Sequence, residues 1–161
     1  MKGEYNQFWN EDRLGRANSK GLKPMECIII ASIIEKESTK RDEYDKIAGV
    51  YTNRIQKGML LQADPTVKFA LNDPSIQRVL LEHLKVDSPY NTYKYAGVPP
   101  GPIGLPEKST IDAVLNATPH NYLYFCASAD FSGYHTFAKT LREHNKNARL
   151  YQRALNKNGI F

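Results

Sequence analysis

The densest run of hydrophobic positions lies between Cys27 and Ile34, where every residue except Ser32 is apolar. Pro24 stands just before this run, and proline suits the first position of a helix because its φ is preset there. The run ends abruptly in charged residues, Glu35 to Glu37. About fifteen helix-compatible residues exceed the usual length of a strand. The pattern therefore predicts a helix over 24–37 that is apolar on almost all sides and lies inside the protein.

Two glutamates close this helix. On a 3.6-residue period Glu35 shares a stripe with Ile28 and Ala31, whereas Glu37 shares one with Ile30. The two carboxylates are about 200° apart, so only one of them can face a given pocket. Apolar walls would raise the pKa of that carboxyl, as a general acid requires near neutral pH. The pattern equally allows two glutamates that merely solvate the end of a core helix.

Weaker periodicities predict the other elements. Further helices are expected at 4–17, 40–57, 65–71, 107–117 and 141–156, and two strands at 121–127 and 134–138 that pair as a hairpin. Residues 76–96 fit either short strands or a short helix, and the proline-rich stretch 98–106 fits a rigid wall of a cleft. The expected fold class is α+β, with a helical part carrying the glutamates at a helix end beside a small, mostly antiparallel sheet.

Size and composition indicate one soluble globular domain. The chain has 161 residues, of which 41% are hydrophobic and 24% charged, and no stretch reaches the roughly 18 apolar residues of a membrane span. Its net charge of +5 suits an anionic polymer or a membrane surface. The basic residues near the C-terminus fit a solvated helix face better than a nucleic-acid site, because no DNA- or RNA-binding motif is present. Cys27 and Cys126 each lie in an apolar run and are expected as core thiols.

Polar residues gather in three further places. Gln62, Asp64 and Thr66 surround a helix start at Pro65, where Asp64 fits an ordinary cap but Gln62 has no such explanation. The stretch 88–93 mixes tyrosines with hydrogen-bonding side chains, as sugar-binding surfaces and ordinary turns both do. His135 in the predicted hairpin fits a cleft or a structural role. Zinc signatures, phosphate-binding loops and the Gly-x-Ser-x-Gly elbow are missing from the sequence, so the chemistry expected here is that of carboxylate, amide and hydroxyl groups.

Taken together, four stretches in this order resemble the YceG-like (MltG) family of endolytic murein transglycosylases. They are Ala31-Ser-Ile-Ile-Glu-Lys-Glu37, Leu61-Gln-Ala-Asp-Pro-Thr66, Ser88-Pro-Tyr-Asn-Thr-Tyr93 with Gly97-Val-Pro-Pro-Gly-Pro-Ile103, and Tyr122-Leu-Tyr-Phe125 with Gly133-Tyr-His-Thr-Phe137. The resemblance covers roughly residues 24–150. It implies a single catalytic domain over 1–161, with an N-terminal helix and linker at 1–22 and the YceG-like core at 23–157. Family members carry an N-terminal inner-membrane anchor and a LysM-like region, so this chain is expected to be a soluble catalytic fragment of a bacterial envelope protein that faces the periplasm.

The resemblance also implies a reaction and its residues. Glu35 falls on the family's catalytic glutamate, with Glu37 as the alternative, and would cleave the bond between N-acetylmuramic acid and N-acetylglucosamine to leave a 1,6-anhydro end. Such a reaction needs one acid that then acts as base, and neither a metal nor a cofactor. Asp64 is expected to orient loops or sugar. The full set of expected substrate contacts is Gln62, Asp64, Thr66, Tyr90, Asn91, Thr92, Tyr93 and His135. Expected partners are peptidoglycan glycan strands and the peptidoglycan synthases, but not nucleic acid.

Three alternatives stand beside this interpretation. A hydrolytic muramidase would use water where the transglycosylase uses the muramic O6. A non-catalytic glycan-binding or scaffolding module would need no acid at all. Some members of the family have been labelled aminodeoxychorismate lyases, which would need pyridoxal phosphate on a lysine; the sequence offers no lysine in a setting suited to that bond.

Overall fold

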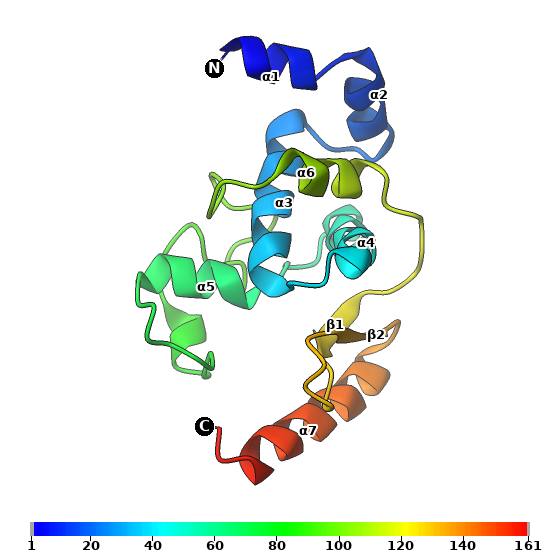
Figure 1. The fold of residues 1–161 in the computed structure, drawn as a ribbon. Helices are drawn as coiled ribbons and strands as arrows, with labels where there is room; N and C mark the ends of the chain where they lie inside the picture. Colours follow the sequence, from blue (N-terminus) through cyan, green and yellow to red (C-terminus); the bar gives the residue numbers. More distant parts are fainter. Residues whose placement is uncertain (1, 161) are drawn as a thin grey trace.

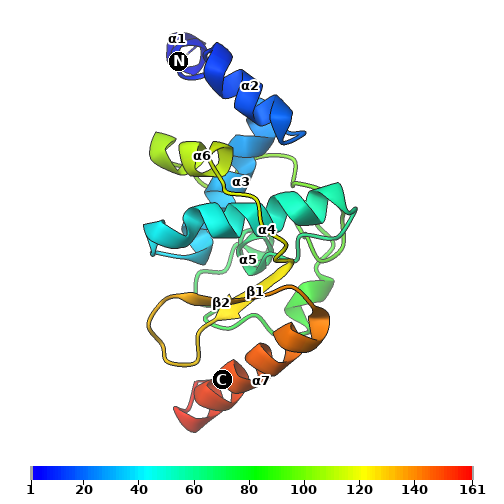
Figure 2. The ribbon, with the colours of Figure 1, turned by 90° about the vertical axis from the view of Figure 1, so that its right-hand side faces the viewer.

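The computed structural model describes residues 2–160 (Figures 1 and 2). Its helices are α1 (Lys2–Phe8), α2 (Glu11–Ser19), α3 (Pro24–Glu37), α4 (Tyr44–Gln56), α5 (Asp64–Leu71), α6 (Lys108–Leu115) and α7 (Leu141–Lys157). Its strands are β1 (Tyr124–Ala127) and β2 (His135–Ala138), and short 3₁₀ turns span Arg41–Glu43 and His83–Lys85. The α+β class predicted from the sequence is confirmed. In the described part of the chain, no helix is both long and apolar enough to cross a membrane.

Helix α3 is the centre of the fold and has the bounds predicted from the sequence. It runs through the middle of the molecule, with α4 and α6 packed beside it and α5 near its C-terminal end (Figure 1). Its buried residues follow one another almost without a break: Cys27, Ile29, Ile30, Ala31, Ser32, Ile33 and Ile34. A helix with so long a buried stretch is held in a fixed position, and so are the starting points of the side chains at its end.

The C-terminal half of α3 also holds the loop before α6. The Ser32 hydroxyl accepts a hydrogen bond of 3.1 Å from the backbone N–H of Ile103. One turn later, a Glu35 carboxylate oxygen accepts hydrogen bonds from the backbone N–H of Glu107 at 2.8 Å and from the Thr110 hydroxyl at 2.6 Å. The carboxylate thus satisfies groups at the N-terminal end of α6, where negative charge is favourable. The proline-rich stretch is thereby fixed against α3.

Helix α4 crosses α3 and anchors the chain that leads into the hairpin (Figure 2). The Asn53 amide donates to the carbonyls of His120 and Tyr122, and Arg54 Nε donates to the carbonyl of Leu123 at 2.6 Å. Gly49 allows this approach, because a Cβ there would lie 2.3 Å from His120 Nε2. The buried face of α4 therefore recognises backbone carbonyls as well as apolar side chains.

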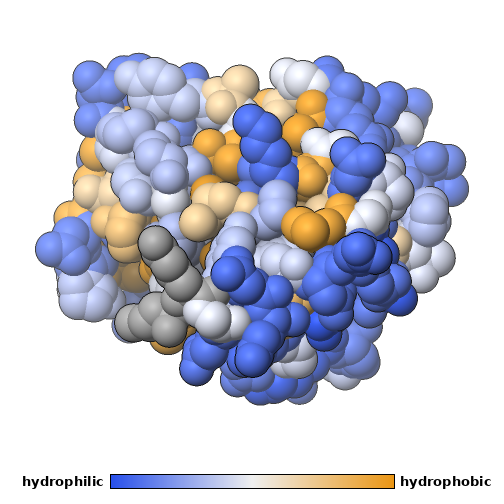
Figure 3. All heavy atoms as spheres, turned by 90° about the horizontal axis from the view of Figure 1, so that it is seen from above, coloured by the Kyte–Doolittle hydropathy of each residue, from blue (hydrophilic) through white to orange (hydrophobic). Residues whose placement is uncertain are grey.

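The predicted hairpin forms, although its first strand begins at Tyr124 and not at residue 121, and the last helix packs on it. Strands β1 and β2 are antiparallel, with Tyr124 opposite Ala138 and Ala127 opposite His135. Helix α7 lies along both strands at the opposite end of the molecule from α1 and α2 (Figures 1 and 2). The view from the α1 and α2 end shows a mostly hydrophilic surface with apolar side chains scattered between the polar ones (Figure 3). Helix α7 and the hairpin thus form a separate layer below the helical part.

Several predicted elements are corrected. The expected helix at 4–17 is broken at Trp9 and Asn10, because the Asn10 side chain accepts from Arg13 N and starts a new helix. The helix expected from residue 40 begins with a 3₁₀ turn and becomes α-helical at Tyr44. Asp64 does not cap α5, since it is the first helical residue and Ala63 takes the capping position. Residues 76–96 form a 3₁₀ turn and loops without a strand.

Replacing Ile33 with alanine is expected to lower the free energy of unfolding by about 2–5 kcal/mol, because truncating a fully buried side chain leaves a cavity. Met25 lies on the same helix with 48% of its surface exposed. Met25→Ala should therefore change stability by less than about 0.5 kcal/mol. Urea unfolding followed by circular dichroism measures both, and equal losses would contradict the central role given to the buried stripe of α3.

Candidate active site

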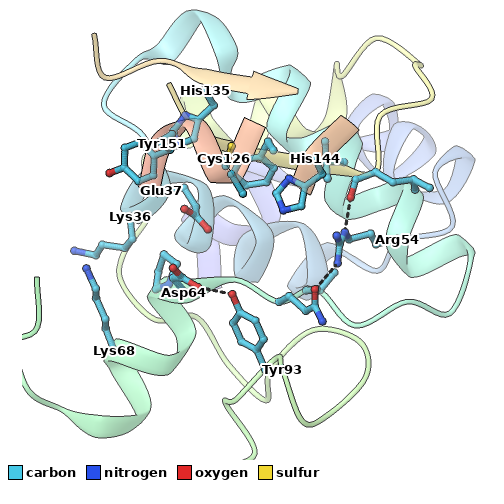
Figure 4. Close-up of a pocket in the computed structure, with 18 of the residues that line it drawn as sticks. Lys36, Glu37, Arg54, Asp64, Lys68, Tyr93, Cys126, His135, His144 and Tyr151 are labelled. Carbon is cyan, nitrogen blue, oxygen red and sulfur yellow. Dashed lines mark hydrogen bonds between the residues drawn. The ribbon is translucent and has the colours of Figure 1, made fainter. Parts of the chain in front are cut away.

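A pocket of about 790 Å³ lies between the helical part and the layer formed by the hairpin and α7. One wall comes from the end of α3, from α4 and from the start of α5, and the facing wall comes from β1, β2 and α7 (Figure 4). The residues of the lining that carry polar, ionisable or thiol side chains are Lys36, Glu37, Arg54, Gln62, Asp64, Lys68, Tyr93, Cys126, His135, His144, Tyr151 and Gln152. Carboxyl, amide, hydroxyl, imidazole and cationic groups therefore meet in one concave space.

Glu37 is the carboxyl that α3 presents to this pocket (Figure 4). One of its oxygens accepts a hydrogen bond of 2.8 Å from the hydroxyl of Tyr51 on α4. Burial, helped by the nearby charge of Asp64, raises the pKa of Glu37 from 4.5 to about 7, against the opposing effects of Tyr51 and Lys68. A carboxyl with this pKa is protonated in a substantial fraction of molecules at neutral pH, as a general acid must be.

Asp64 is the second carboxyl of the pocket, and Tyr93 binds it. The Tyr93 hydroxyl donates to Asp64 Oδ1 at 2.5 Å. Burial raises the pKa of Asp64, while the hydrogen bond from Tyr93 and the charge of Lys68 act in the opposite direction. Burial and the Asp64 carboxylate raise the pKa of Tyr93, so its phenol keeps its proton and stays a hydrogen-bond donor at neutral pH. Two carboxyls in different surroundings can take different protonation states, as acid and base assignments require.

Glu35 lies away from this pocket. The two glutamates face different ways, as the helical period predicts: Glu35 bonds to groups of α6, while Glu37 lines the pocket. The two groups that donate to Glu35, the Glu107 backbone N–H and the Thr110 hydroxyl, belong to the N-terminal end of α6, and Glu35 is not part of the pocket lining. The geometry therefore favours Glu37, the alternative named from the sequence, over Glu35 as the group that meets a substrate.

Gln62 lies in the pocket wall with a backbone of unusual conformation. Its φ is +52°, in the left-handed region that residues with a side chain rarely adopt. Its side-chain oxygen lies 3.5 Å from Arg54 Nη1, which also donates to the Leu60 carbonyl at 2.7 Å. Burial lowers the pKa of the Arg54 guanidinium. Such strain is found at functional sites where the surrounding structure holds it in place. The expected position of Gln62 in a pocket is thus observed.

Three of the expected substrate contacts are buried and hydrogen-bond to backbone groups inside the protein instead of facing the pocket. Asn91 donates its amide to the carbonyls of Leu84 and Val86, and Thr92 accepts from Ala63 N at 2.9 Å and meets the Thr66 hydroxyl at 2.8 Å. Thr66, Asn91 and Thr92 have at most 1% of their surface exposed, so no surface is left for a glycan. Their polar groups serve to satisfy buried backbone near Gln62 and Asp64.

Tyr90 and His135, the remaining expected contacts, differ from each other. Tyr90 lies outside the pocket lining and packs its ring at 4.8 Å from that of Phe69. His135 lines the pocket but also binds Glu43, whose two carboxylate oxygens lie 3.0 Å from the backbone nitrogen and 2.5 Å from Nδ1 of His135. The hydroxyl of Ser38, the residue after Glu37, donates to the same carboxylate at 2.7 Å. Glu43 therefore clamps the hairpin to the end of α3.

Sequence reasoning missed Glu43, Arg54 and the residues that α7 contributes. One signal for Arg54 was available, because it continues the buried helical stripe of Ile47 and Tyr51, where an apolar residue is the usual choice. Cys126, expected as a core thiol, is half-buried and lines the pocket. Within residues 2–160, no group of three or more His, Cys, Asp or Glu side chains is arranged to hold a metal ion.

Comparison with known proteins gives one family. Residues 1–150 match the model of the YceG-like family. The endolytic murein transglycosylase of Bacillus subtilis strain 168 is 45% identical over 124 residues, which make up 77% of this chain and 34% of that protein. Its counterpart in Streptococcus pneumoniae strain D39 is 35% identical over 133 residues, 80% of this chain and 24% of that protein. The chain thus spans about a quarter to a third of the length of these relatives.

A solved structure agrees with the fold. The crystal structure of the YceG-like protein lmo1499 from Listeria monocytogenes superposes with a TM-score of 0.74 at 42% sequence identity, covering 82% of this chain and 42% of that one. At this identity and coverage, the two chains share the arrangement of helices and hairpin described above.

The raised pKa of Glu37 should make the fold less stable as the pH rises. Between about pH 4.5 and 7, the folded protein keeps a proton that the unfolded chain has lost, so the free energy of unfolding falls across this window. Glu37→Gln removes the effect and should exceed the parent in stability by about 1–3 kcal/mol at pH 8, with a smaller difference at pH 4. Thermal unfolding at the two pH values measures it.

Glu35→Gln is the matched control for this measurement. It removes a charge that stabilises the N-terminal end of α6, so it should be less stable than the parent at pH 8. A gain in stability for Glu35→Gln and not for Glu37→Gln would show that the buried carboxyl has been assigned to the wrong glutamate.

Proposed function

The chain belongs to the YceG-like family, and we propose that it carries the catalytic centre of an endolytic lytic transglycosylase acting on peptidoglycan. The bond cleaved would be the one between N-acetylmuramic acid and N-acetylglucosamine within a glycan strand. The relatives named endolytic murein transglycosylases support this activity, since each aligns with most of the present chain. The single observation that carries the proposal is the half-buried Glu37 with its pKa near 7 in the wall of a large polar pocket.

Glu37 is the proposed acid and base. In its protonated form it would give its proton to the glycosidic oxygen, so that the bond from that oxygen to C1 of the muramic residue breaks and the leaving sugar gains a hydroxyl. The muramic O6 would then form a bond to C1, and its proton would pass to the Glu37 carboxylate. The product is a 1,6-anhydro end, the carboxyl is regenerated, and no water is consumed.

Neighbouring groups prepare Glu37 for both steps. Burial and the charge of Asp64 favour the protonated acid before the bond breaks. The hydroxyl of Tyr51 donates to Glu37 and stabilises the carboxylate that forms afterwards. The Asp64 carboxylate, held by Tyr93 at 2.5 Å, is placed to balance positive charge that develops at C1 during cleavage. Gln62, Tyr93 and His135 are the proposed glycan contacts among the residues expected from the sequence, because all three line the pocket.

Asp64 also gives a specific reason to consider hydrolysis. Most glycosidases use two carboxyl groups, one as acid and one as base for water or as nucleophile. Glu37 and Asp64 share one pocket, and the charge of Asp64 helps to raise the pKa of Glu37. A muramidase would leave a reducing muramic end instead of the anhydro end. The chemical nature of the new end therefore distinguishes the two reactions.

We also propose a setting for this activity. The murein named in the relatives' descriptions is a cell-wall polymer, and this supports a substrate outside the cytoplasm. Membrane anchoring of the whole protein, with this domain facing the periplasm or wall, and cooperation with peptidoglycan synthases are proposals that rest on the family resemblance. Fractionation of cells producing the complete protein tests the anchoring directly.

Glu37→Gln should reduce strand cleavage by about 10²–10⁴-fold, because amide nitrogen cannot replace a carboxyl in proton transfer. Glu35→Gln should keep at least about a third of the parent activity, since Glu35 contacts α6 and not the pocket. Mass spectrometry of digested peptidoglycan measures the yield and identifies the new ends. Circular dichroism confirms that both variants are folded.

Each result of this digestion has a meaning. Anhydro ends from the parent support the transglycosylase, and reducing ends indicate a muramidase. Full activity of Glu37→Gln would reject the proposed acid. A folded parent that binds strands and leaves them intact would indicate a glycan-binding module.

The pH dependence of kcat/KM should follow the ionisation of Glu37. Since the acid must be protonated, kcat/KM should fall as the pH rises through about 7. Tyr51→Phe removes a donor that favours the ionised form, so the fall should move to higher pH. A profile that is flat between pH 6 and 9 in both proteins would contradict this assignment. The measurement is the initial rate of strand cleavage in a series of buffers of equal ionic strength.

A further inference from the structure

Two lysines in the pocket have no role in the reaction described above. Lys36 lies on α3 between the two glutamates, and Lys68 lies on α5, one turn after Asp64. Both line the pocket, and in Figure 4 their ammonium ends point to the same side of it, away from Arg54 and His144. The Lys36 side chain also lies along the loop at Gly104. Two positive charges thus stand at one edge of the space that holds Glu37.

Among the residues that the structure describes, no acidic side chain forms an ion pair with either lysine. Ion pairs elsewhere in the structure join Arg13 with Asp112, Arg41 with Glu107 and Lys94 with Asp87. In the part of the chain that the structure describes, neither Lys36 nor Lys68 forms an ion pair or a side-chain hydrogen bond. A structural role in joining elements therefore does not explain them.

The charge of Lys68 opposes the protonated state that the proposed acid needs. Lys68 lowers the pKa of both Glu37 and Asp64. A positive charge beside a general acid favours the carboxylate, which has no proton to give. An anion bound between the lysines would cancel their charge and leave the acid protonated. The two positive charges at this edge of the pocket therefore fit an anionic group on the substrate.

We propose that Lys36 and Lys68 form a subsite for a carboxylate of the substrate, which on a peptidoglycan strand is carried by the O3 substituent of muramic acid. This inference rests on the proposed function. The two sugar rings of the strand are otherwise uncharged, so the carboxylate is the feature that separates the muramic residue from its neighbour. On a bare strand it ends the lactyl group; on a strand that carries peptides, the lactyl group is amidated and the carboxylates belong to the peptide.

This subsite gives the pocket a direction. An ammonium group binds a carboxylate as a point charge with several donors, and two lysines can hold its two oxygens. With the muramic substituent at the lysine edge, the muramic ring would lie on the same side of Glu37, and its C1 and O6 would face the acid. Binding of the carboxylate therefore selects which of the two alternating glycosidic bonds is cleaved.

The test is calorimetric titration of soluble strands into the chain with Glu37→Gln, so that bound strands stay intact. Lys36→Gln and Lys68→Gln are combined in this background. Lys57→Gln with Lys157→Gln is the matched control, because it removes the same charge from exposed positions outside the pocket. The strands are used in three forms: bare, peptide-bearing, and with all carboxylates converted to amides. Circular dichroism confirms the fold of each variant.

We expect the pocket pair of substitutions to weaken binding of carboxylate-bearing strands about tenfold, and of amidated strands less than twofold. A loss confined to bare strands assigns the lactyl carboxylate, a loss confined to peptide-bearing strands assigns the peptide, and a loss on both shows that either is accepted. An equal loss on amidated strands, an equal loss in the control, or no loss overturns the proposal. Lysine-dependent binding by a parent that cleaves nothing would reject the enzymatic function and retain the subsite.

Discussion

Burial raises the pKa of Glu37 to about 7, and this burial depends on the packed stretch of α3 that precedes the last turn. Because Ile33 and Ile34 are buried and α3 packs on α4, α5 and α6, α3 cannot rotate or slide to expose this half-buried carboxyl further. Part of the free energy gained by packing the apolar residues therefore offsets the cost of keeping a carboxyl away from solvent. The environment that makes the acid useful follows from the core of the fold and not from the pocket alone.

The opposite wall of the pocket depends on a second buried carboxylate. Glu43 is only 6% exposed, and its two oxygens accept from the Ser38 hydroxyl and the His135 backbone N–H and contact Nδ1 of His135. Ser38 directly follows the acid, whereas His135 begins β2, so one side chain fixes the distance between the two walls. A buried carboxylate with all its partners present gives defined geometry more than it gives net stability. It is suited to hold the hairpin in register with Glu37.

The sequence predicted the fold better than the site, for reasons that particular residues make clear. The length and the bounds of α3 follow from a local pattern, and so does the hairpin. The periodicity also showed that Glu35 and Glu37 diverge. It could not show which one meets the pocket, because the partners of Glu35 come from Glu107 and Thr110, more than 70 positions later in the chain.

The motif around Asn91 shows a second limit of sequence reasoning. Amide and hydroxyl side chains in a turn fit a sugar-binding surface and a buried network equally well, and only burial separates the two. Here the network supports Gln62 and Asp64, which do line the pocket. Residues identified from a functional motif were thus close to the site, but several of them hydrogen-bond to its backbone and do not face the pocket. Glu43 and Arg54 escaped prediction because their partners are distant backbone and imidazole groups.

Helix α7 packs mainly on the two strands, and it contributes Ala148, Tyr151 and Gln152 to the pocket wall opposite Glu37. Exchanges at these positions would change the shape offered to a ligand without disturbing the helices that set the strength of the acid. The acidity of Glu37 and the preference for a ligand thus depend on different helices, so each can change during evolution while the other is kept. For laboratory evolution, a library confined to this helix would explore new ligands in a chain whose proton-transfer group is already in place.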